Sequence, residues 1–157
     1  MSTTIHLIRH AKAKNRLTWE EPDRVRPLTK RGRREAQAIA ARLGHESLAR
    51  LVSSPFVRCV QTLEPLAVEL ELPLETTDLL AEGADGPSAV ALLLSLAERG
   101  PIACCTHGDV VFEVVDAVAR TGIPLDGQRG APVASTWVLE VVEGRFVAAR
   151  FVEQPPR

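Results

Sequence analysis

The chain has 157 residues, a length that suits one globular domain with room for a hydrophobic core, and we predict a single domain over residues 1–157. A hydrophobic fraction of 45% and a charged fraction of 25% exclude a disordered chain and a membrane-embedded one. The net charge of −1 is unlike that of a duplex-binding domain, which is usually basic throughout.

The first predicted element is a short buried strand over Thr4–Arg9, whose residues are mostly apolar or β-branched. Residues 11–28 are expected to be irregular. A helix then runs from a cap at Thr29 to Leu43, and Gly44 ends it. Its apolar stripe, which we expect to face the core, consists of Ala36, Ile39, Ala40 and Leu43.

A second strand over Leu51–Ser53 leads into a second helix, predicted over residues 55–71. The dipeptide Ser54-Pro55 resembles a helix start, because a serine hydroxyl accepts from free backbone N–H groups and a proline at the first helical position loses no hydrogen bond. An extended piece near Leu74–Thr76 and an acidic, glycine-containing loop precede a third helix, from about Ser88 to Glu98.

Ile102–Cys105 is an apolar run of the type found in central parallel strands, and a helix through Val118 follows it. Trp137–Val142 and Phe146–Phe151, separated by a glycine turn, predict a terminal β-hairpin. The segment from Thr121 to Ala134 has no pattern that assigns it to an element. Because strands and helices alternate, we predict an α/β fold, a three-layer α/β/α sandwich with a mostly parallel central sheet.

Charge is distributed unevenly along the chain. Residues 9–34 hold ten Lys and Arg against three Asp and Glu, whereas residues 63–98 hold eight acids and no Lys or Arg. This asymmetry is typical of an anion-attracting mouth in an otherwise neutral protein, and the alternative is a set of solvated helix faces.

Three cysteines, Cys59, Cys104 and Cys105, cannot all pair, and the last two stand in a predicted strand. We therefore expect buried thiols and a reducing, cytoplasmic location. The N-terminus has no signal-peptide pattern, and no apolar run reaches the roughly 18 residues that span a bilayer. No membrane partner is expected.

Four residues suited to phosphate binding are expected to converge at the carboxyl ends of the strands, namely Arg9, His10, Arg58 and His107. Two guanidinium groups can hold phosphoryl oxygens through paired hydrogen bonds, and the N-terminus of the helix after His107 adds partial positive charge. A neutral imidazole is also a nucleophile toward phosphorus. We assign that role to His10, which directly follows a strand, and phosphoryl binding to His107, although the residues alone leave the reverse assignment open.

A leaving alkoxide needs a proton, so a carboxyl group near this cluster is expected. Glu82, in the loop before the third helix, is the best candidate. Asp85 and Asp109 are alternatives, and Asp109 is expected to cap its helix. His10 and His107 have no third ligand at metal-binding spacing and stand beside arginines, so we expect neither a metal ion nor another cofactor.

Three motifs resemble those of the histidine phosphatase superfamily, which is also called phosphoglycerate mutase-like. The Arg-His-Gly/Ala motif of that superfamily is similar to Arg9–Ala11, and its Ser-Pro-x-x-Arg-x-x-Gln-Thr motif is similar to Ser54–Thr62. Its second histidine motif is similar to Thr106–Gly108. The resemblance covers nearly the whole chain and implies the phosphoglycerate mutase-like fold.

The resemblance also implies a role for each candidate residue. His10 becomes phosphorylated in such an enzyme, and Glu82 matches the position of the proton donor. Asn15 and Arg16 stand near the position of an asparagine in the mutases of the family, which implies that they bind substrate. The residues that match the family's phosphoryl-binding groups are Arg9, Arg58 and His107.

Within the superfamily, the short length, Ala11 and the segment Arg26–Thr29 resemble the SixA-type phosphohistidine phosphatases. Leu79–Gly83, His107–Val110 and Ser135–Glu140 are similar to the phosphatase domain that is fused to some Nudix hydrolases. These 157 residues include no Nudix segment, so the substrate stays open between a phosphorylated small molecule and a phosphohistidine-bearing protein.

We therefore predict a metal-independent phosphatase that hydrolyses phosphomonoesters or protein phosphohistidine through a phosphohistidine intermediate on His10. One alternative is a non-catalytic module that binds a phosphorylated ligand. Another is a mutase-type phosphotransferase, which the short chain disfavours because mutases use longer insertions to close over a small substrate.

Overall fold

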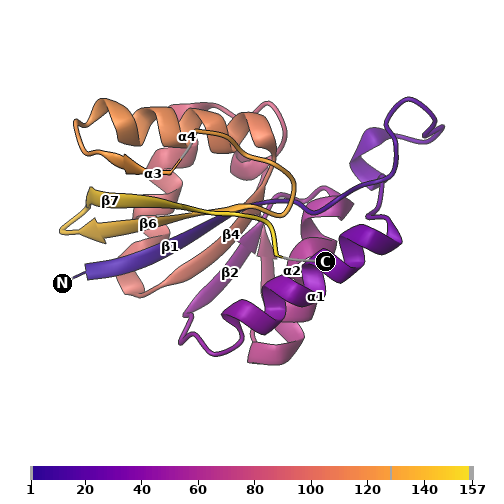
Figure 1. Cartoon of the computed structure of the whole chain (residues 1–157), viewed down its shortest axis with the longest axis horizontal. Helices are drawn as coiled ribbons and strands as arrows, with labels where there is room; N and C mark the ends of the chain where they lie inside the picture. The colour runs from indigo at the N-terminus through magenta and orange to yellow at the C-terminus, as the bar shows by residue number, and fades with distance from the viewer. Residues whose placement is uncertain (1, 128, 156–157) are drawn as a thin grey trace.

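A computed structural model describes residues 2–127 and 129–155, and these residues form a seven-stranded sheet with helices on both faces (Figure 1). The strands are β1 (Ser2–Arg9), β2 (Arg50–Ser53), β3 (Leu74–Thr76), β4 (Ile102–Thr106), β5 (Leu125–Asp126), β6 (Thr136–Val142) and β7 (Arg145–Val152). The α-helices are α1 (Lys30–Leu43), α2 (Val57–Leu70), α3 (Gly86–Leu96) and α4 (Gly108–Arg120). Short 3-10 turns are η1 (Asp23–Val25), η2 (Asp78–Leu80) and η3 (Ala97–Arg99).

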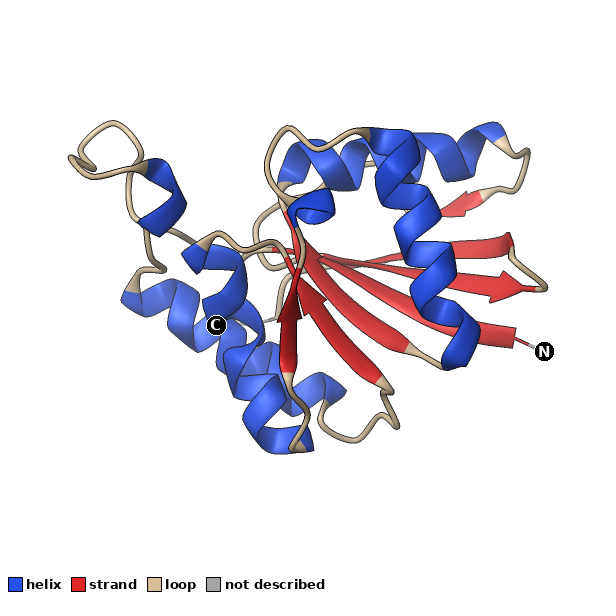
Figure 2. Cartoon of the chain, turned by 180° about the vertical axis from the view of Figure 1, so that it is seen from behind, coloured by secondary structure: helices blue, strands red, loops and turns tan. Residues whose placement is uncertain are grey.

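The strand order in the sheet is β3-β2-β4-β1-β6-β7-β5. The first four strands of this order are mutually parallel, β6 and β7 form an antiparallel hairpin on the other side of β1, and β5 pairs in parallel with β7. The mostly parallel sheet predicted from the sequence is therefore confirmed. Figure 2 shows the strands in red with helices in front of and behind them.

The parallel register places the carboxyl ends of three strands at one edge of the sheet. Arg9 pairs with Thr106 at the ends of β1 and β4, and Ser53 at the end of β2 pairs with Cys105. Side chains that follow these residues are therefore close in space although they are far apart in the sequence.

Each face of the sheet is covered by two helices, and each interface holds a separate hydrophobic cluster. The cluster under α3 and α4 includes Leu93, Val114 and Trp137, and the cluster under α1 and α2 includes Ile39 and Leu63. All five residues of β4 are buried, as expected for a central parallel strand. The three-layer α/β/α architecture is confirmed, and it gives the strand ends a rigid support.

Most predicted helix boundaries agree with the structure, because the capping residues act as expected. Thr29 caps α1 by accepting from the backbone N–H of Gly32 over 3.0 Å, and Gly44 is the C-terminal cap. The third helix begins two residues earlier than predicted, because Asp85 caps α3 by accepting from the N–H of Ser88. The previously unassigned segment between α4 and β6 contains the short edge strand β5.

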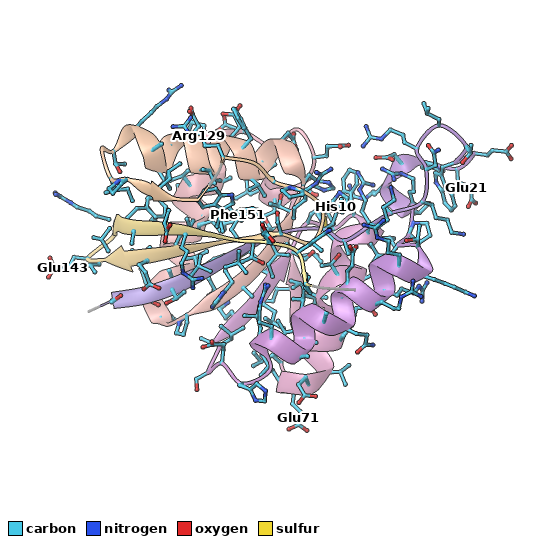
Figure 3. All side chains as sticks on the ribbon, in the orientation of Figure 1. His10, Glu21, Glu71, Arg129, Glu143 and Phe151 are labelled. Atoms are coloured by element: carbon cyan, nitrogen blue, oxygen red, sulfur yellow. The ribbon has the colours of Figure 1, made fainter. Side chains whose placement is uncertain are left out.

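Residues 11–28, which were predicted to be irregular, form an extension that stands out from the body of the molecule, with Glu21 near its tip (Figures 1 and 3). The base of this extension is held by an antiparallel bridge between Ala13 and Leu28. The N–H of Lys14 donates to the carbonyl of Pro27 beside this bridge. The two chain segments at the base, around Ala13 and Leu28, are therefore held side by side.

No helix in the described part of the chain is long and apolar enough to cross a membrane.

Candidate active site

A cavity of about 950 Å³ lies at the carboxyl ends of β1 and β4. Four of the five predicted catalytic residues line it, namely Arg9, His10, Glu82 and His107. The fifth, Arg58, is fully buried and contacts Glu82 and His107. The structure thus brings together all five residues that the sequence predicted, and Figure 3 shows His10 at the end of the sheet between the two helical layers.

His10 directly follows β1 and is 7% exposed. Its ring Nδ1 lies 2.8 Å from the carbonyl oxygen of Ala11, which can only accept, so Nδ1 carries a proton and donates it. Burial, together with the positive charges of Arg58 and Arg9, lowers the pKa of His10 to about 3. The imidazole is therefore neutral near pH 7, and its Nε2 carries a lone pair.

His107 ends the chain segment between β4 and α4 and is the N-cap residue of α4. Its ring centroid lies 5.5 Å from that of His10. The Nε2 atom of His107 is 2.9 Å from the hydroxyl of Ser54, and Nδ1 is 3.5 Å from Nη2 of Arg58. Because both ring nitrogens of His107 already have partners, His10 is the better placed of the two histidines to act as the nucleophile.

Arg58 reaches the site from the first turn of α2 and is held by an aspartate from the extension. Its Nη1 donates to the backbone oxygen of Asp23, and its Nη2 donates to the Asp23 carboxylate, each over 3.0 Å. Partial burial raises the pKa of Asp23, but hydrogen bonds from Arg26 and Arg58 outweigh that effect and hold the pKa below its ordinary value. Asp23 was not among the predicted site residues, and its only signal in the sequence is an acid near arginines in an irregular segment.

Arg9 extends from the end of β1 over the first turn of α4. Its Nη1 donates to the carbonyl of Ala131 over 2.7 Å. Burial, followed by the charge of Arg58, lowers the pKa of Arg9. A Cβ atom at Gly108 would lie only 3.2 Å from Cζ and Nε of Arg9, so the glycine allows the guanidinium to lie against the helix.

Two guanidinium N–H groups in this region lack an acceptor among the described residues. They are the buried Nε atoms of Arg9 and Arg58. A buried donor without a partner costs free energy, so such groups are expected where a ligand supplies the acceptor. The two Nε–H groups are candidate donors to an anionic ligand.

Glu82 lies in the loop between η2 and α3. Its Oε1 accepts from Nη2 of Arg16 over 2.8 Å, and its Oε2 is 3.5 Å from Nη2 of Arg58. The loop is held by Asp109, whose carboxylate accepts from the N–H of Gly83 over 2.8 Å. Among the described residues, no group of three His, Cys, Asp or Glu side chains is arranged to hold a metal ion.

The expectation that Asp109 caps its helix is therefore wrong. His107 occupies the N-cap position of α4 and makes no capping hydrogen bond through its side chain. Asp85, the other alternative to Glu82, is engaged as the cap of α3. Of the three carboxylates considered, only Glu82 contacts Arg58.

Asn15 and Arg16, the predicted substrate-binding residues, both line the cavity. The side-chain oxygen of Asn15 accepts from the N–H of Leu17 within the extension. Arg16 is paired with Glu82. Both residues thus lie at the cavity, and Arg16 contacts the candidate proton donor directly.

The motif Ser54–Thr62 holds the two histidine segments in place. Ser54 was predicted to start the second helix, and α2 begins at Val57. The Ser54 hydroxyl accepts from the N–H of Phe56, the N-cap residue of α2, over 3.2 Å, and it also contacts His107. Thr62 accepts from the N–H of Ala11 over 2.9 Å and donates to the carbonyl of Arg58 over 2.7 Å. These supporting contacts were not predicted, because they depend on the packing of α2 against the strand ends.

Cys59 also lies against His107. It was predicted to be a core residue, and it is fully buried, as are Cys104 and Cys105. Its Sγ is 3.5 Å from Nε2 of His107. The three thiols are free, so the expectation of buried, unpaired cysteines is confirmed.

The site combines the groups that phosphoryl transfer requires. A neutral imidazole with a free Nε2 is a nucleophile toward phosphorus. Two guanidinium groups and the N-terminus of α4 can stabilise the negative charge of the transferring group. A carboxylate within reach of these groups can move a proton.

Comparisons with known proteins agree with this chemistry. A family model described as the histidine phosphatase superfamily (branch 1) matches residues 5–88. The 8-oxo-(d)GTP phosphatase of Mycolicibacterium smegmatis is 35% identical over 156 residues, which cover 97% of this chain. The chain spans about half of that relative, 48% of its length.

Solved structures establish the same fold. The protein histidine phosphatase SixA, in complex with tungstate, superposes with a TM-score of 0.78 at 24% identity, over 97% of this chain and 96% of that one. The mycobacterial glucosyl-3-phosphoglycerate phosphatase superposes with a TM-score of 0.71 at 15% identity, over 99% of this chain and 100% of that one. The matched family model, the conjunction of motifs and the fold lead to one conclusion. The chain belongs to branch 1 of the histidine phosphatase superfamily.

Proposed function

We propose that this histidine phosphatase hydrolyses phosphomonoesters or protein phosphohistidine through a covalent phosphohistidine on His10, without a metal ion. The observation that carries the proposal is the state of His10. Its Nδ1–H is engaged with the carbonyl of Ala11, and its pKa is lowered to about 3. A nucleophile that is neutral and oriented before substrate arrives needs no separate activating base.

In the first half-reaction, the Nε2 lone pair of His10 attacks the phosphorus atom and forms an N–P bond. The bond between phosphorus and the leaving oxygen breaks, and its electron pair stays with that oxygen. The carboxyl group of Glu82 gives its proton to the leaving oxygen, which departs as an alcohol. With a phosphohistidine substrate, a P–N bond breaks in the same way and the imidazole of the substrate takes the proton.

In the second half-reaction, water attacks the phosphorus atom of the phosphorylated His10. The carboxylate of Glu82 accepts a proton from this water, so the carboxyl group is restored for the next cycle. The N–P bond breaks, its electron pair returns to Nε2, and inorganic phosphate leaves. Neutral His10 is regenerated.

Negative charge on the transferring phosphoryl group is stabilised by Arg9, Arg58 and His107. Preorganised donors of this kind usually make the largest contribution to catalysis in phosphoryl transfer. The unpartnered Nε–H groups of Arg9 and Arg58 supply donors that are already in place. Backbone N–H groups at the start of α4, beside Gly108, add to the same field.

We further propose that the phosphatase acts without a metal ion, because the arginines beside His10 and His107 repel a cation and supply the charge stabilisation themselves. It works as one domain over residues 1–157. Its location is the cytoplasm, in keeping with three free, buried cysteines.

A nucleotide phosphate is a second candidate substrate. The relative that acts as an 8-oxo-(d)GTP phosphatase is 35% identical across 97% of this chain, although it is about twice as long. A phosphohistidine-bearing protein is supported by the fold of SixA, at 24% identity. Both substrates present a phosphoryl group to the same His10.

The test is hydrolysis of p-nitrophenyl phosphate in the presence of EDTA, with His10→Ala and His45→Ala as matched variants. His45 is an exposed histidine outside the cavity. We expect turnover in EDTA, loss of turnover in His10→Ala, and full turnover in His45→Ala. An N–P bond is hydrolysed in acid. The reaction with ³²P-labelled substrate is therefore quenched with alkali, and the labelled protein is then detected.

Three outcomes would contradict the proposal. Turnover that survives His10→Ala would remove His10 from the reaction. A labelled intermediate that forms once and is not hydrolysed would indicate a non-catalytic module, and transfer of the label to an added alcohol acceptor in preference to water would indicate a mutase.

A further inference from the structure

Two lysines line the cavity on the side of the extension. Lys12 and Lys14 both belong to the extended segment that follows His10, and both face the cavity. The residue between them, Ala13, is buried and forms the bridge with Leu28. Side chains two residues apart in an extended segment project to the same side, so Lys12 and Lys14 leave the backbone on the side of the cavity.

The backbone that carries these lysines is held firmly. The N–H of Lys14 donates to the carbonyl of Pro27 over 3.0 Å, and the carbonyl of Lys12 accepts from the N–H of Thr29 over 2.9 Å. A Cβ atom at Gly32 would collide with the carbonyl oxygen of Lys12, so α1 packs directly on this segment. The lysines therefore extend from a fixed base near the nucleophile.

Neither lysine forms an ion pair among the described residues, and the ammonium of Lys14 lies 6.0 Å from the centroid of the Trp19 ring. Other cations that line the cavity have carboxylate partners, since Arg16 pairs with Glu82 and Arg26 pairs with Asp23. Neither lysine has a carboxylate oxygen within 4.0 Å in the part of the chain that the structure describes. The remaining lining cation, Arg9, lies beside His10 and is suited to the transferring phosphoryl group.

The cavity has room for more than one phosphate group. Its volume of about 950 Å³ is at the upper end of the range for sites that bind whole small molecules. Five cations, Arg9, Lys12, Lys14, Arg16 and Arg26, and two carboxylates, Glu82 and Asp109, line it. A ligand with a single phosphoryl group would leave positive charge uncompensated at the far side of the cavity.

We propose that Lys12 and Lys14 form a second anion subsite, and that the substrate is a small phosphate ester or anhydride that carries a second phosphate group. The inference rests on the proposed function, because the first phosphate group must lie at His10. The second group belongs to the leaving part of the substrate and is not transferred. A nucleoside diphosphate and a nucleoside bisphosphate share this chemistry.

The first experiment measures binding in the His10→Ala background, where no turnover interferes. Dissociation constants for AMP, ADP and adenosine 3′,5′-bisphosphate are measured by calorimetry. We expect the ligands with two phosphates to bind about tenfold or more tightly than AMP, as for charge-assisted contacts to a phosphate. Tighter binding of ADP than of the bisphosphate would place the second subsite next to the first. Tighter binding of the bisphosphate would place it farther away.

Lys12→Gln and Lys14→Gln are then combined in the same background, and Lys30→Gln serves as the control. Lys30 belongs to the same basic stretch of sequence, is exposed, and does not line the cavity. We expect the preference for two phosphates over one to fall to about twofold in the double variant and to stay unchanged in Lys30→Gln. Equal binding of AMP and both doubly phosphorylated ligands, or a preference that survives the double variant, would overturn the inference.

The second experiment separates this inference from the proposed function. It uses protein with His10 intact. We measure kcat/KM for the preferred doubly phosphorylated substrate and for p-nitrophenyl phosphate, and take the ratio of the two values. This ratio is compared between the parent and the double lysine variant. A fall of about tenfold in this ratio supports the subsite. A ratio that does not change overturns it, whereas absence of turnover with every substrate counts against the proposed function and leaves the binding experiment as the test of the subsite.

Discussion

Arg58 donates to both the backbone oxygen and the carboxylate of Asp23, each over 3.0 Å, although 35 positions separate the two residues in the sequence. The arginine comes from α2 and the aspartate from the extension formed by residues 11–28. Because Arg58 is fully buried, it cannot find a replacement partner in solvent. The orientation of Arg58 therefore depends on a segment that stands outside the body of the fold.

We predict that Asp23→Asn lowers kcat/KM by about tenfold or more, because Arg58 loses a charged partner and becomes free to turn away from the phosphoryl group. Steady-state kinetics with p-nitrophenyl phosphate measure the effect. Asp78→Asn is the control, since Asp78 is exposed and pairs with Arg24 at 3.6 Å outside the cavity. Equal activity in both variants would show that Arg58 does not need Asp23.

Glu82→Gln is expected to slow the reaction most for substrates with poor leaving groups. An alkyl phosphate requires a proton on the leaving oxygen, so its kcat should fall by roughly 10²–10⁴-fold. The nitrophenolate of p-nitrophenyl phosphate leaves without protonation, so its first half-reaction should be affected far less. Rates of phosphoenzyme formation, measured by rapid quench with both substrates, give the comparison. An equal loss for both would mean that Glu82 has no role as an acid.

Gly108→Ala tests the contact between Arg9 and α4. The added methyl group would lie 3.2 Å from the Arg9 guanidinium, so we expect the arginine to shift and kcat/KM to fall by about tenfold. Alanine favours a helix more than glycine does, so stability should not decrease at this position on propensity grounds. Kinetics and thermal unfolding are measured on the same sample. A stable variant with unchanged kcat/KM would show that the exact place of Arg9 is unimportant.

The pKa of His10 predicts how stability depends on pH. In the unfolded chain this histidine takes up a proton near its ordinary pKa of 6.5, whereas in the folded protein it stays neutral until about pH 3. The unfolded state therefore binds more protons between these values, and stability falls as the pH is lowered through 6.5. His10→Gln should remove this contribution, which amounts to roughly 3 kcal/mol between pH 6.5 and 4.

Urea unfolding at pH 7 and pH 4 measures this difference, with His45→Gln as a control at an exposed histidine. The parent and the control should lose more stability on acidification than His10→Gln does. Equal losses in all three proteins would mean that burial of His10 does not disfavour its protonation.

The layered fold could be predicted because local patterns and global packing agree. The apolar stripe of α1 was predicted to face the core, and the continuous apolar run of β4 was predicted to be a central strand. Both are buried as predicted. Ser54 indicated the start of α2 to within a few residues, since its hydroxyl accepts from the N–H of Phe56, but its second contact, with a histidine from a distant segment, could not be predicted. The two-residue strand β5 is too short for any pattern to reveal it.

In the candidate site, too, some residues could be predicted from local patterns and others could not. Arg9, His10 and His107 could be identified because each follows a predicted strand, and parallel strands bring such positions to one edge. Asp23 could not, because its role arises from the path of an irregular segment over α2. Sequence patterns record periodicity within an element, whereas a contact between a loop and a helix depends on the tertiary structure alone.

In the proposed mechanism, the hydrogen bond from His10 to its neighbour Ala11 also determines which positional isomer of phosphohistidine forms. Phosphohistidine exists in two forms, according to which ring nitrogen carries the phosphate. With Nδ1–H held by the Ala11 carbonyl at 2.8 Å, only the other nitrogen is available, so a single positional isomer should form. Antibodies or ³¹P spectra that distinguish the two isomers would therefore report the tautomer of His10 in the resting protein from the isomer of the intermediate.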